Sequence, residues 1–342
     1  MIRRRAIQFI VSLLVGGACL WLAFRDVDFD DATQAVSRIP AWVYLVHIAS
    51  LVAQFLMRCL RWSLQVRGQL GKMPRYLDAM AINAVSFAGL FLLPFRLGEF
   101  IRPYLCAQRG YMRKTTALAQ SAVERVIDGL VTTVFFAVVL LLLEEQNLPP
   151  EIRYAGWLGL LVFGGASVVL ALGVQAREAS ERFWNRWIGL ISTGLAERLV
   201  GTLRSFLDGI ASLGPGPFLG YLVLTVGYWL LNGASMGLIM WSMGMNVGLV
   251  AAYFTLCFLV ISVMLPAPPG NVGNFHAFTK WALLLMGVAE GPAVAFAVIL
   301  HICQVCTLVA GASFFLARGD VSFARLKEAT REGSGAEAGA KP

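Results

Sequence analysis

Eight long apolar segments alternate with short polar stretches along the chain. Six of them approach the roughly 20 residues that an α-helix needs to cross the hydrocarbon of a bilayer. We expect transmembrane helices at residues 6–24, 41–60, 117–143, 155–174, 218–243 and 293–316. The other two segments, residues 76–93 and 250–265, lead directly into Pro- and Gly-rich sequence. The pattern predicts an all-α polytopic membrane protein with about six transmembrane helices.

The two remaining segments end in the same motif, LPxxxG, at residues 93–98 and, 172 positions later, at residues 265–270. Pro and Gly interrupt a helix, and an interrupted backbone at membrane depth needs protein or water around its polar groups. Helix breakers at matching places in two halves are typical of transporters. We interpret the segments as re-entrant hairpins; alternatively, Pro and Gly only kink two ordinary crossings. The predicted backbone hinges are Pro94, Gly98, Pro266, Pro269, Gly270 and Gly273.

The composition excludes a soluble domain, since 58% of the residues are hydrophobic, 14% are charged and the mean hydropathy is +0.70. A net charge of +8 would suggest a nucleic-acid partner in a soluble protein. Here Lys and Arg collect in loops on alternate sides of the apolar segments, which indicates membrane topology instead. The six cysteines lie mostly in apolar runs. We therefore predict no nucleic acid, cofactor, metal or disulfide framework.

Loop charges predict the orientation. Residues 25–40 carry four Asp against two Arg, whereas residues 58–75 carry only basic charges. The positive-inside rule places the second loop in the cytoplasm, together with both termini, in a plasma or inner membrane. The first hairpin then enters from the cytoplasm and the second from the opposite face. The two halves, about 1–174 and 218–318, would be inverted repeats.

Two further segments complete the predicted layout of the 1–318 membrane domain. Residues 175–217 mix Trp, Ile and Leu with charges at near-helical spacing, which is typical of an amphipathic helix on the inner membrane surface. Residues 319–342 are polar and rich in Gly and Ala, so we expect a disordered cytoplasmic tail.

The first motif carries charges at three-residue steps, at Arg96, Glu99 and Arg102. On a helix these side chains would share a face. Each charge at membrane depth costs a few kcal/mol unless it is paired, solvated or directed into a cavity, which favours a functional role. The alternative is a cytoplasmic rim whose arginines only satisfy the positive-inside rule.

A second group of charges interrupts the apolar segment from residue 117 to residue 143. Glu124 and Asp128 are four residues apart and flank Arg125, a spacing that predicts a buried ion network. Such a network could hold the first hairpin, contact a lipid headgroup or relay protons. Structural pairing explains the pattern equally well.

The second motif continues with neutral polar residues, Asn271, Asn274 and His276, which we include among the candidate site residues. His276 could titrate near physiological pH if exposed, although a hydrogen-bonded structural role is the simpler interpretation. Four further polar groups in apolar segments are expected to form interhelical hydrogen bonds: His47, Gln54, His301 and Gln304.

These motifs together resemble the lysylphosphatidylglycerol synthase transmembrane, or flippase-like, family. The resemblance extends from about residue 6 to about residue 318. It rests on Arg61-Trp62, Asn83, the motif from Leu93 to Arg102, Glu124-Arg125-x-x-Asp128 and Pro269-Gly270-x-x-Gly273-x-Phe275-His276. In the best-studied relatives, this module is similar to a lipid flippase joined to a soluble aminoacyltransferase domain. We expect a standalone member without that domain.

The resemblance implies a transporter that moves a phospholipid, an aminoacylated lipid or a polyprenyl-linked lipid between leaflets. Arg96 and Arg125 would pair the phosphate, because a guanidinium binds phosphate oxygens bidentately. Glu99, Glu124 and Asp128 would balance charge or take up a proton. No catalytic residue is predicted.

Two alternatives remain: a membrane-embedded transferase, and an accessory subunit that recruits a cytoplasmic lipid-modifying enzyme. The spacing Gly233-x-x-x-Gly237 permits close helix packing, within the chain or in a homo-oligomer.

Overall fold

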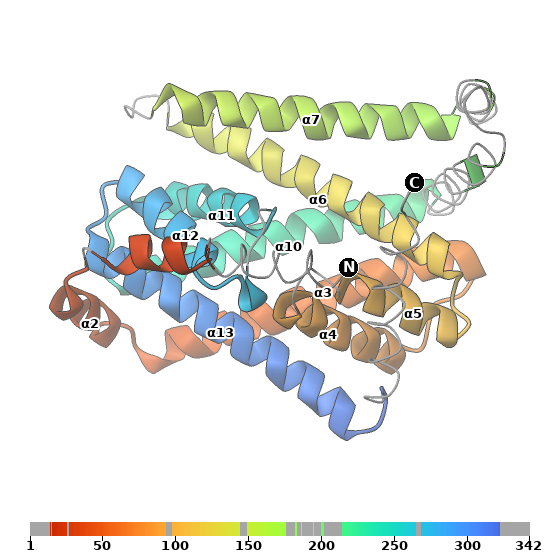
Figure 1. The fold of residues 1–342 in the computed structure, drawn as a ribbon, viewed down its shortest axis with the longest axis horizontal. Helices are drawn as coiled ribbons and strands as arrows, with labels where there is room; N and C mark the ends of the chain where they lie inside the picture. The colour runs from red at the N-terminus through yellow and green to blue at the C-terminus, as the bar shows by residue number, and fades with distance from the viewer. Residues whose placement is uncertain are drawn as a thin grey trace.

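The protein is a bundle of α-helices in the computed structural model (Figure 1). Four helices in the described part are long and apolar enough to cross a membrane, and no strand occurs there. The predicted class, a polytopic helical membrane protein, is therefore confirmed. The structure describes residues 14, 16–25, 27–93, 98–143, 149–175, 182, 186, 194, 200–201, 214–264 and 268–321.

Two units of four helices form the body of the bundle, and each unit has a long, a medium, a short and a long helix in that order. The first unit consists of α3 (Ala41–Leu70), α4 (Tyr76–Leu92), α5 (Ile101–Gln108) and α6 (Lys114–Leu142). The second unit consists of α10 (Pro215–Ser242), α11 (Gly248–Met264), α12 (Asn274–Leu285) and α13 (Glu290–Ala317).

Three outer segments pack on this body. The short helix α2 (Phe29–Ser37) lies against the start of α13, and the helical residues 16–24 lie against the loop before α12. The long helix α7 (Pro150–Gln175) lies along α6 at the edge of the bundle (Figure 1).

The helices end where the sequence breaks them. Gly71 caps α3 in the left-handed conformation, with φ of 70°, and its N–H bonds to the carbonyl of Arg67. Leu93 ends α4 in an extended conformation, since a residue before proline disfavours the helical region. The loop before α12 contains Gly270 and Gly273 with φ of 76° and 91°, which non-glycine residues rarely adopt.

The α4–α5 segment, which we call the first hairpin, returns to the end of the bundle at which it begins. Asp78 in the first turn of α4 forms an ion pair with Arg109, directly after α5. Tyr111 donates a hydrogen bond of 2.6 Å to the same carboxylate. Burial raises the pKa of the Tyr111 phenol, and the bond to Asp78 raises it further, so the phenol stays a neutral donor.

The turn between the arms of the first hairpin is tightly closed. A Cβ atom at Gly98 would collide with the backbone of Leu90, and one at Gly89 would collide with the side chain of Ile101. Only glycine allows this close approach between the end of α4 and the start of α5.

The α11–α12 segment, the second hairpin, is closed in the same way. Val250 near the start of α11 and Leu285 at the end of α12 belong to one apolar cluster with Phe254 and Ala282. The residues between the arms, Pro268 to Gly273, form its tip.

The hairpins begin at opposite ends of the bundle. The first follows the C-terminal end of α3, a helix of 30 residues that is about 45 Å long. The second begins near the other end of α3, because Gly244 before α11 lies next to Arg38. The two tips meet inside: Gly270 of the second lies against Phe91 of the first.

Equivalent helices of the two units run in opposite directions. Arg58 and Arg61 of α3 bond to Tyr228 and Tyr221 of α10, at 3.1 and 2.8 Å, so residue numbers rise along one helix as they fall along the other.

The first helix of each hairpin also packs on the last helix of the other unit. Phe136 of α6 contacts Phe254 of α11, with ring centroids 6.0 Å apart, and Phe91 of α4 contacts His301 of α13 at 5.8 Å. Equivalent helices of the two units thus make equivalent contacts.

One prediction about this region is wrong. The structure continues α3 to Leu70, so Arg58, Arg61 and Arg67 are helical rather than part of a loop. The helix continues because Trp62 and Val66 keep an apolar face buried against α4, and counting arginines as loop residues overlooks this face.

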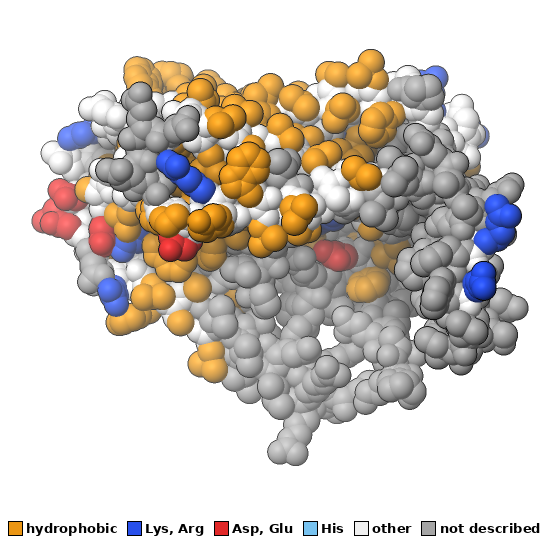
Figure 2. Space-filling model, turned by 90° about the horizontal axis from the view of Figure 1, so that it is seen from above, with side chains coloured by type: hydrophobic (Ala, Val, Ile, Leu, Met, Phe, Trp, Pro, Cys, Tyr) orange, Lys and Arg blue, Asp and Glu red, His pale blue; other side chains and the backbone are white. Residues whose placement is uncertain are grey.

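The amphipathic segment predicted at 175–217 and the tail predicted at 319–342 lie mostly outside the described residues. The outer surface fits a membrane environment, because apolar side chains cover most of the described part of the face in Figure 2. The exposed apolar residues include Leu161, Leu141 and Leu45, which are 73%, 65% and 67% exposed.

Candidate functional site

Two buried ion pairs connect α3 and the first hairpin to α6. We call the four paired residues the ionic cluster: Arg61, Arg102, Glu124 and Asp128. Arg61 pairs with Asp128 at 2.8 Å, and Arg102 pairs with Glu124 at 2.7 Å. Glu124 and Asp128 are one turn apart on α6, so both carboxylates face the same side of that helix.

Helix α10 supports the first pair. The hydroxyl of the neutral Tyr221 accepts a hydrogen bond of 2.8 Å from Arg61. The centroid of its ring lies 4.7 Å from the guanidinium carbon. Trp229 donates a longer bond of 3.4 Å to Asp128. The side chain of Arg61 is only 1% exposed, so this pair is held away from solvent.

The second pair belongs to the first hairpin. Arg102 lies in the first turn of α5, and besides Glu124 it donates a hydrogen bond of 2.9 Å to the hydroxyl of Ser121. The side chains of Arg102 and Glu124 are 11% and 8% exposed. The pair therefore ties the short arm of the hairpin to α6.

A third arginine beside the cluster makes the local charge positive. Arg58 stacks on Phe87 at 4.0 Å and bonds to Tyr228. Three guanidinium groups thus lie near two carboxylates. In addition, Nε of Arg58, Nε and Nη1 of Arg61, and Nη1 of Arg102 are buried without a hydrogen-bond acceptor among the described residues. Buried donors without acceptors are costly, and an anion with several oxygens would satisfy them.

Arg125 is an exposed charge next to the cluster, on the same helix as Glu124 and Asp128. It lies within electrostatic range of Glu124, Arg58, Arg102 and Glu99. Glu99 is exposed as well. Accessible charges of both signs therefore lie beside the buried ones.

The sequence-predicted residues of the first half are placed as follows. Glu124 and Asp128 take part in buried ion pairs, but their partners are Arg102 and Arg61 and not the predicted Arg125. Arg125 flanks the network instead of holding it. Glu99 lies in a 3₁₀ turn before α5, so it does not continue the helical face of Arg102, and Arg96 lies outside the described residues, as do the predicted hinges Pro94 and Pro266.

The residue that sequence reasoning missed is Arg61. The two signals for it were the Arg61-Trp62 pair in the family motif and the apolar sequence that continues after it. Its partners Tyr221 and Asp128 are far away along the chain, so no local sequence pattern predicts the contacts.

The polar residues of the second half form a different kind of centre. His301 of α13 makes a hydrogen bond of 2.7 Å through Nε2 with the carbonyl of Gly270, and its ring stacks on Phe275 at 5.0 Å. His276 meets His301 edge to face at 4.8 Å. His301 thus forms a hydrogen bond, but with a backbone carbonyl at the tip of the second hairpin rather than with a neighbouring membrane helix, and Gln54 bonds to Ser50 within α3.

The two asparagines of the second motif lie on either side of Gly273. Asn271 is half-buried and has φ of 58°, a left-handed conformation that asparagine tolerates better than most residues. Asn274 is 1% exposed at the start of α12. Neither is shown to join the ionic cluster of the first half.

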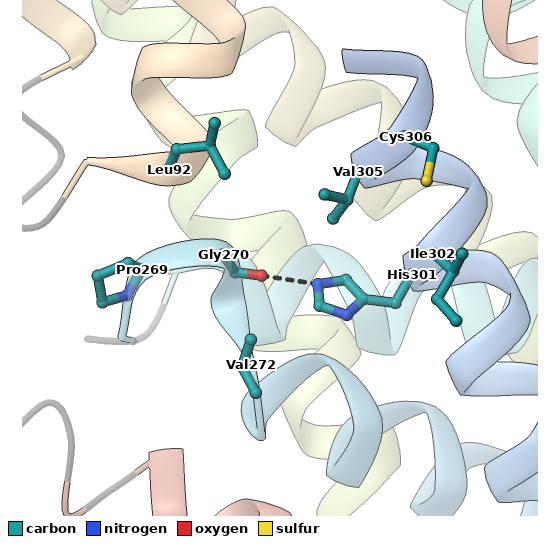
Figure 3. A pocket seen from close by; sticks show the side chains of 8 residues that line it. All are labelled: Leu92, Pro269, Gly270, Val272, His301, Ile302, Val305 and Cys306. Atoms are coloured by element: carbon teal, nitrogen blue, oxygen red, sulfur yellow. Dashed lines mark hydrogen bonds between the residues drawn. The ribbon is translucent and has the colours of Figure 1, made fainter. Parts of the chain in front are cut away.

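A small apolar pocket of about 380 Å³ opens beside the His301–Gly270 bond (Figure 3). It is lined by the end of α4, the tip of the second hairpin and one face of α13, through Leu92, Pro269, Gly270, Val272, His301, Ile302, Val305 and Cys306.

The fold is that of a polytopic helical membrane protein, and the ionic cluster is a buried charged centre in its first unit, supported by α10. The chain belongs to the lysylphosphatidylglycerol synthase transmembrane-region family, whose family model matches residues 9–311. The resemblance inferred from the motifs is thereby confirmed, and the family associates the chain with membrane lipid metabolism or transport. No curated protein and no solved structure gives a significant match to the chain.

Proposed function

We propose that the protein is a lipid transporter that moves a lipid with an anionic headgroup between the leaflets of the plasma or inner membrane. The observation that carries this proposal is the ionic cluster, with its excess of guanidinium groups and its donors without acceptors. Buried charges inside membrane helices are costly, and they mark substrate or ion pathways in membrane proteins.

The headgroup phosphate would bind where Arg58, Arg61 and Arg102 converge. Their unused N–H groups supply several donors, and the two carboxylates leave a local charge of +1 that one phosphate would neutralise. Arg125 and Glu99, which are exposed beside the cluster, would receive the headgroup first. Arg96 belongs to the same route by its place in the motif.

The hairpins would act as the moving parts. In this proposal both are re-entrant, the first from the cytoplasm and the second from the opposite face, and both termini are cytoplasmic. The contact pattern of the two units supports it, because alternating-access carriers are built from inverted repeats whose broken helices meet near the midplane. An interrupted backbone at membrane depth needs protein partners, and at the second tip the carbonyl of Gly270 already bonds to His301.

Transport is proposed in preference to catalysis. The buried carboxylates are already engaged by arginines, which suits charge balance and headgroup binding better than acid–base chemistry. Phospholipids, aminoacylated lipids and polyprenyl-linked lipids all carry the phosphate that the cluster would recognise.

The test is lipid translocation by purified protein in proteoliposomes, with a fluorescent phosphatidylglycerol as the probe. Arg125→Gln removes an exposed charge next to the cluster, so the fold should persist while translocation falls. Arg113→Gln, at the exposed start of the same helix, is the matched control and should translocate as the wild type does. Equal rates for all three proteins would count against the proposal.

A further inference from the structure

The apolar pocket lies where the moving parts of the proposed transporter meet. Leu92 belongs to the first hairpin, Gly270 and Val272 belong to the tip of the second, and Val305 belongs to α13 (Figure 3). A shift of either hairpin relative to α13 would therefore change the shape of the pocket.

The exposed residues that line the pocket are apolar. Ile302, Leu92 and Val272 are 56%, 43% and 38% exposed, and in the proposed transporter we expect bilayer hydrocarbon to cover them. Two polar groups in the wall, the imidazole of His301 and the carbonyl of Gly270, bond to each other. A cavity with these walls offers water too few partners, so an apolar group is its natural occupant.

The size of the pocket suits part of a lipid chain. Its volume of about 380 Å³ lies at the lower end of small-molecule sites, which span roughly 300–1,000 Å³. A chain gains little by leaving one apolar medium for another, so the pocket would orient a bound lipid rather than anchor it.

The tip of the first hairpin connects this pocket to the ionic cluster. Leu92 lines the pocket, and Gly89, one turn earlier on α4, touches Ile101. Ile101 immediately precedes Arg102, whose guanidinium pairs with Glu124. The pocket and the cluster therefore both adjoin the tip of the first hairpin, and a lipid that bound both would contact this tip.

We propose that this pocket binds a hydrocarbon chain of the transported lipid while the headgroup occupies the ionic cluster. The inference rests on the proposed function, since it assumes that the cluster receives a headgroup. It assigns Leu92, Val272, Ile302 and Val305 to chain binding.

The experiment maps where a lipid chain lies. The full-length protein is reconstituted with phosphatidylglycerol that carries a photoreactive diazirine in one acyl chain, or with phosphatidylcholine that carries the same chain. After illumination, mass spectrometry locates the labelled peptides. We expect phosphatidylglycerol to label residues 301–306 and 269–272 severalfold more than phosphatidylcholine does.

Two variants test whether the label comes from the pocket. Val305→Trp fills it and should abolish the excess label, whereas Val309→Trp, one turn further along α13 and outside the pocket, should leave the excess unchanged. If Val305→Trp fails to fold, the comparison of the two lipids in the wild-type protein still tests the proposal. Equal labelling by the two lipids would mean bulk bilayer lipid only and would overturn the proposal, as would excess label that survives in Val305→Trp.

The proposed function fails separately. If translocation depends on Arg125 but the pocket shows no excess label, the chain site is wrong and the proposed transport function is still supported. If neither Arg125-dependent translocation nor excess label is observed, both the proposed function and the chain site are wrong.

Discussion

Replacing Asp128 with Asn tests the ionic cluster through its effect on stability. The change keeps the size of the side chain but removes the charge that pairs with Arg61 at 2.8 Å. Arg61 is 1% exposed, and its remaining partner is the hydroxyl of Tyr221. The buried guanidinium thus loses its ion-pair partner.

Breaking a buried ion pair in this way costs about 3–5 kcal/mol. The hydrogen bond to Tyr221 remains, so we expect the free energy of unfolding to fall by about 3 kcal/mol. Equilibrium unfolding in mixed detergent micelles measures the change. A free energy within about 0.5 kcal/mol of the wild-type value would refute the reasoning, because that is the range of ordinary surface substitutions.

The matched control removes both charges. Arg61→Met with Asp128→Leu replaces the pair with apolar groups of similar size, a change that is often neutral or stabilising. We expect this double variant to unfold with nearly the wild-type free energy. Instability as large as that of Asp128→Asn would show that the charge imbalance is not the cause.

Three further substitutions test the hairpins by thermal unfolding. Gly98→Ala should lower the free energy of unfolding by about 1–3 kcal/mol, because the new Cβ would collide with the backbone of Leu90. The control Gly311→Ala places its Cβ in open space and should change the free energy of unfolding by less than about 0.5 kcal/mol. His301→Ala leaves the carbonyl of Gly270 without its donor and should cost about 1–3 kcal/mol; an unchanged melting temperature would argue against that bond. Gly273→Ala is strained at φ of 91° and faces the carbonyl of Gly16, so a cost below about 1 kcal/mol would contradict the close packing of residues 16–24 on the second tip.

The sequence predicts the broad architecture well, because membrane helices and their interruptions depend on local properties. Length and hydrophobicity mark the long helices, and the two LPxxxG motifs mark the ends of α4 and α11. Helices α3 and α10 pack antiparallel, while the inversion of the two halves stays a prediction. The number of membrane crossings stays a prediction.

The sequence predicts only part of the candidate site. Glu124 and Asp128 stand out because two acids interrupt an apolar helix. Their partners do not, since Arg61 and Arg102 lie on other helices and the pairing depends on how those helices pack. Charge counting even assigned Arg61 to a loop, because the positive-inside rule treats every arginine near a helix end alike.

The measurement that tests the central claim most directly is translocation of phosphatidylglycerol by the double variant Arg102→Gln/Glu124→Gln in proteoliposomes. The variant leaves no charge unpaired at this position, so it should fold, as size-exclusion and thermal unfolding would verify. We predict that it binds and moves the lipid far more slowly than the wild type does. Translocation at the wild-type rate by the folded double variant would contradict the account, because the pair would then serve the structure alone.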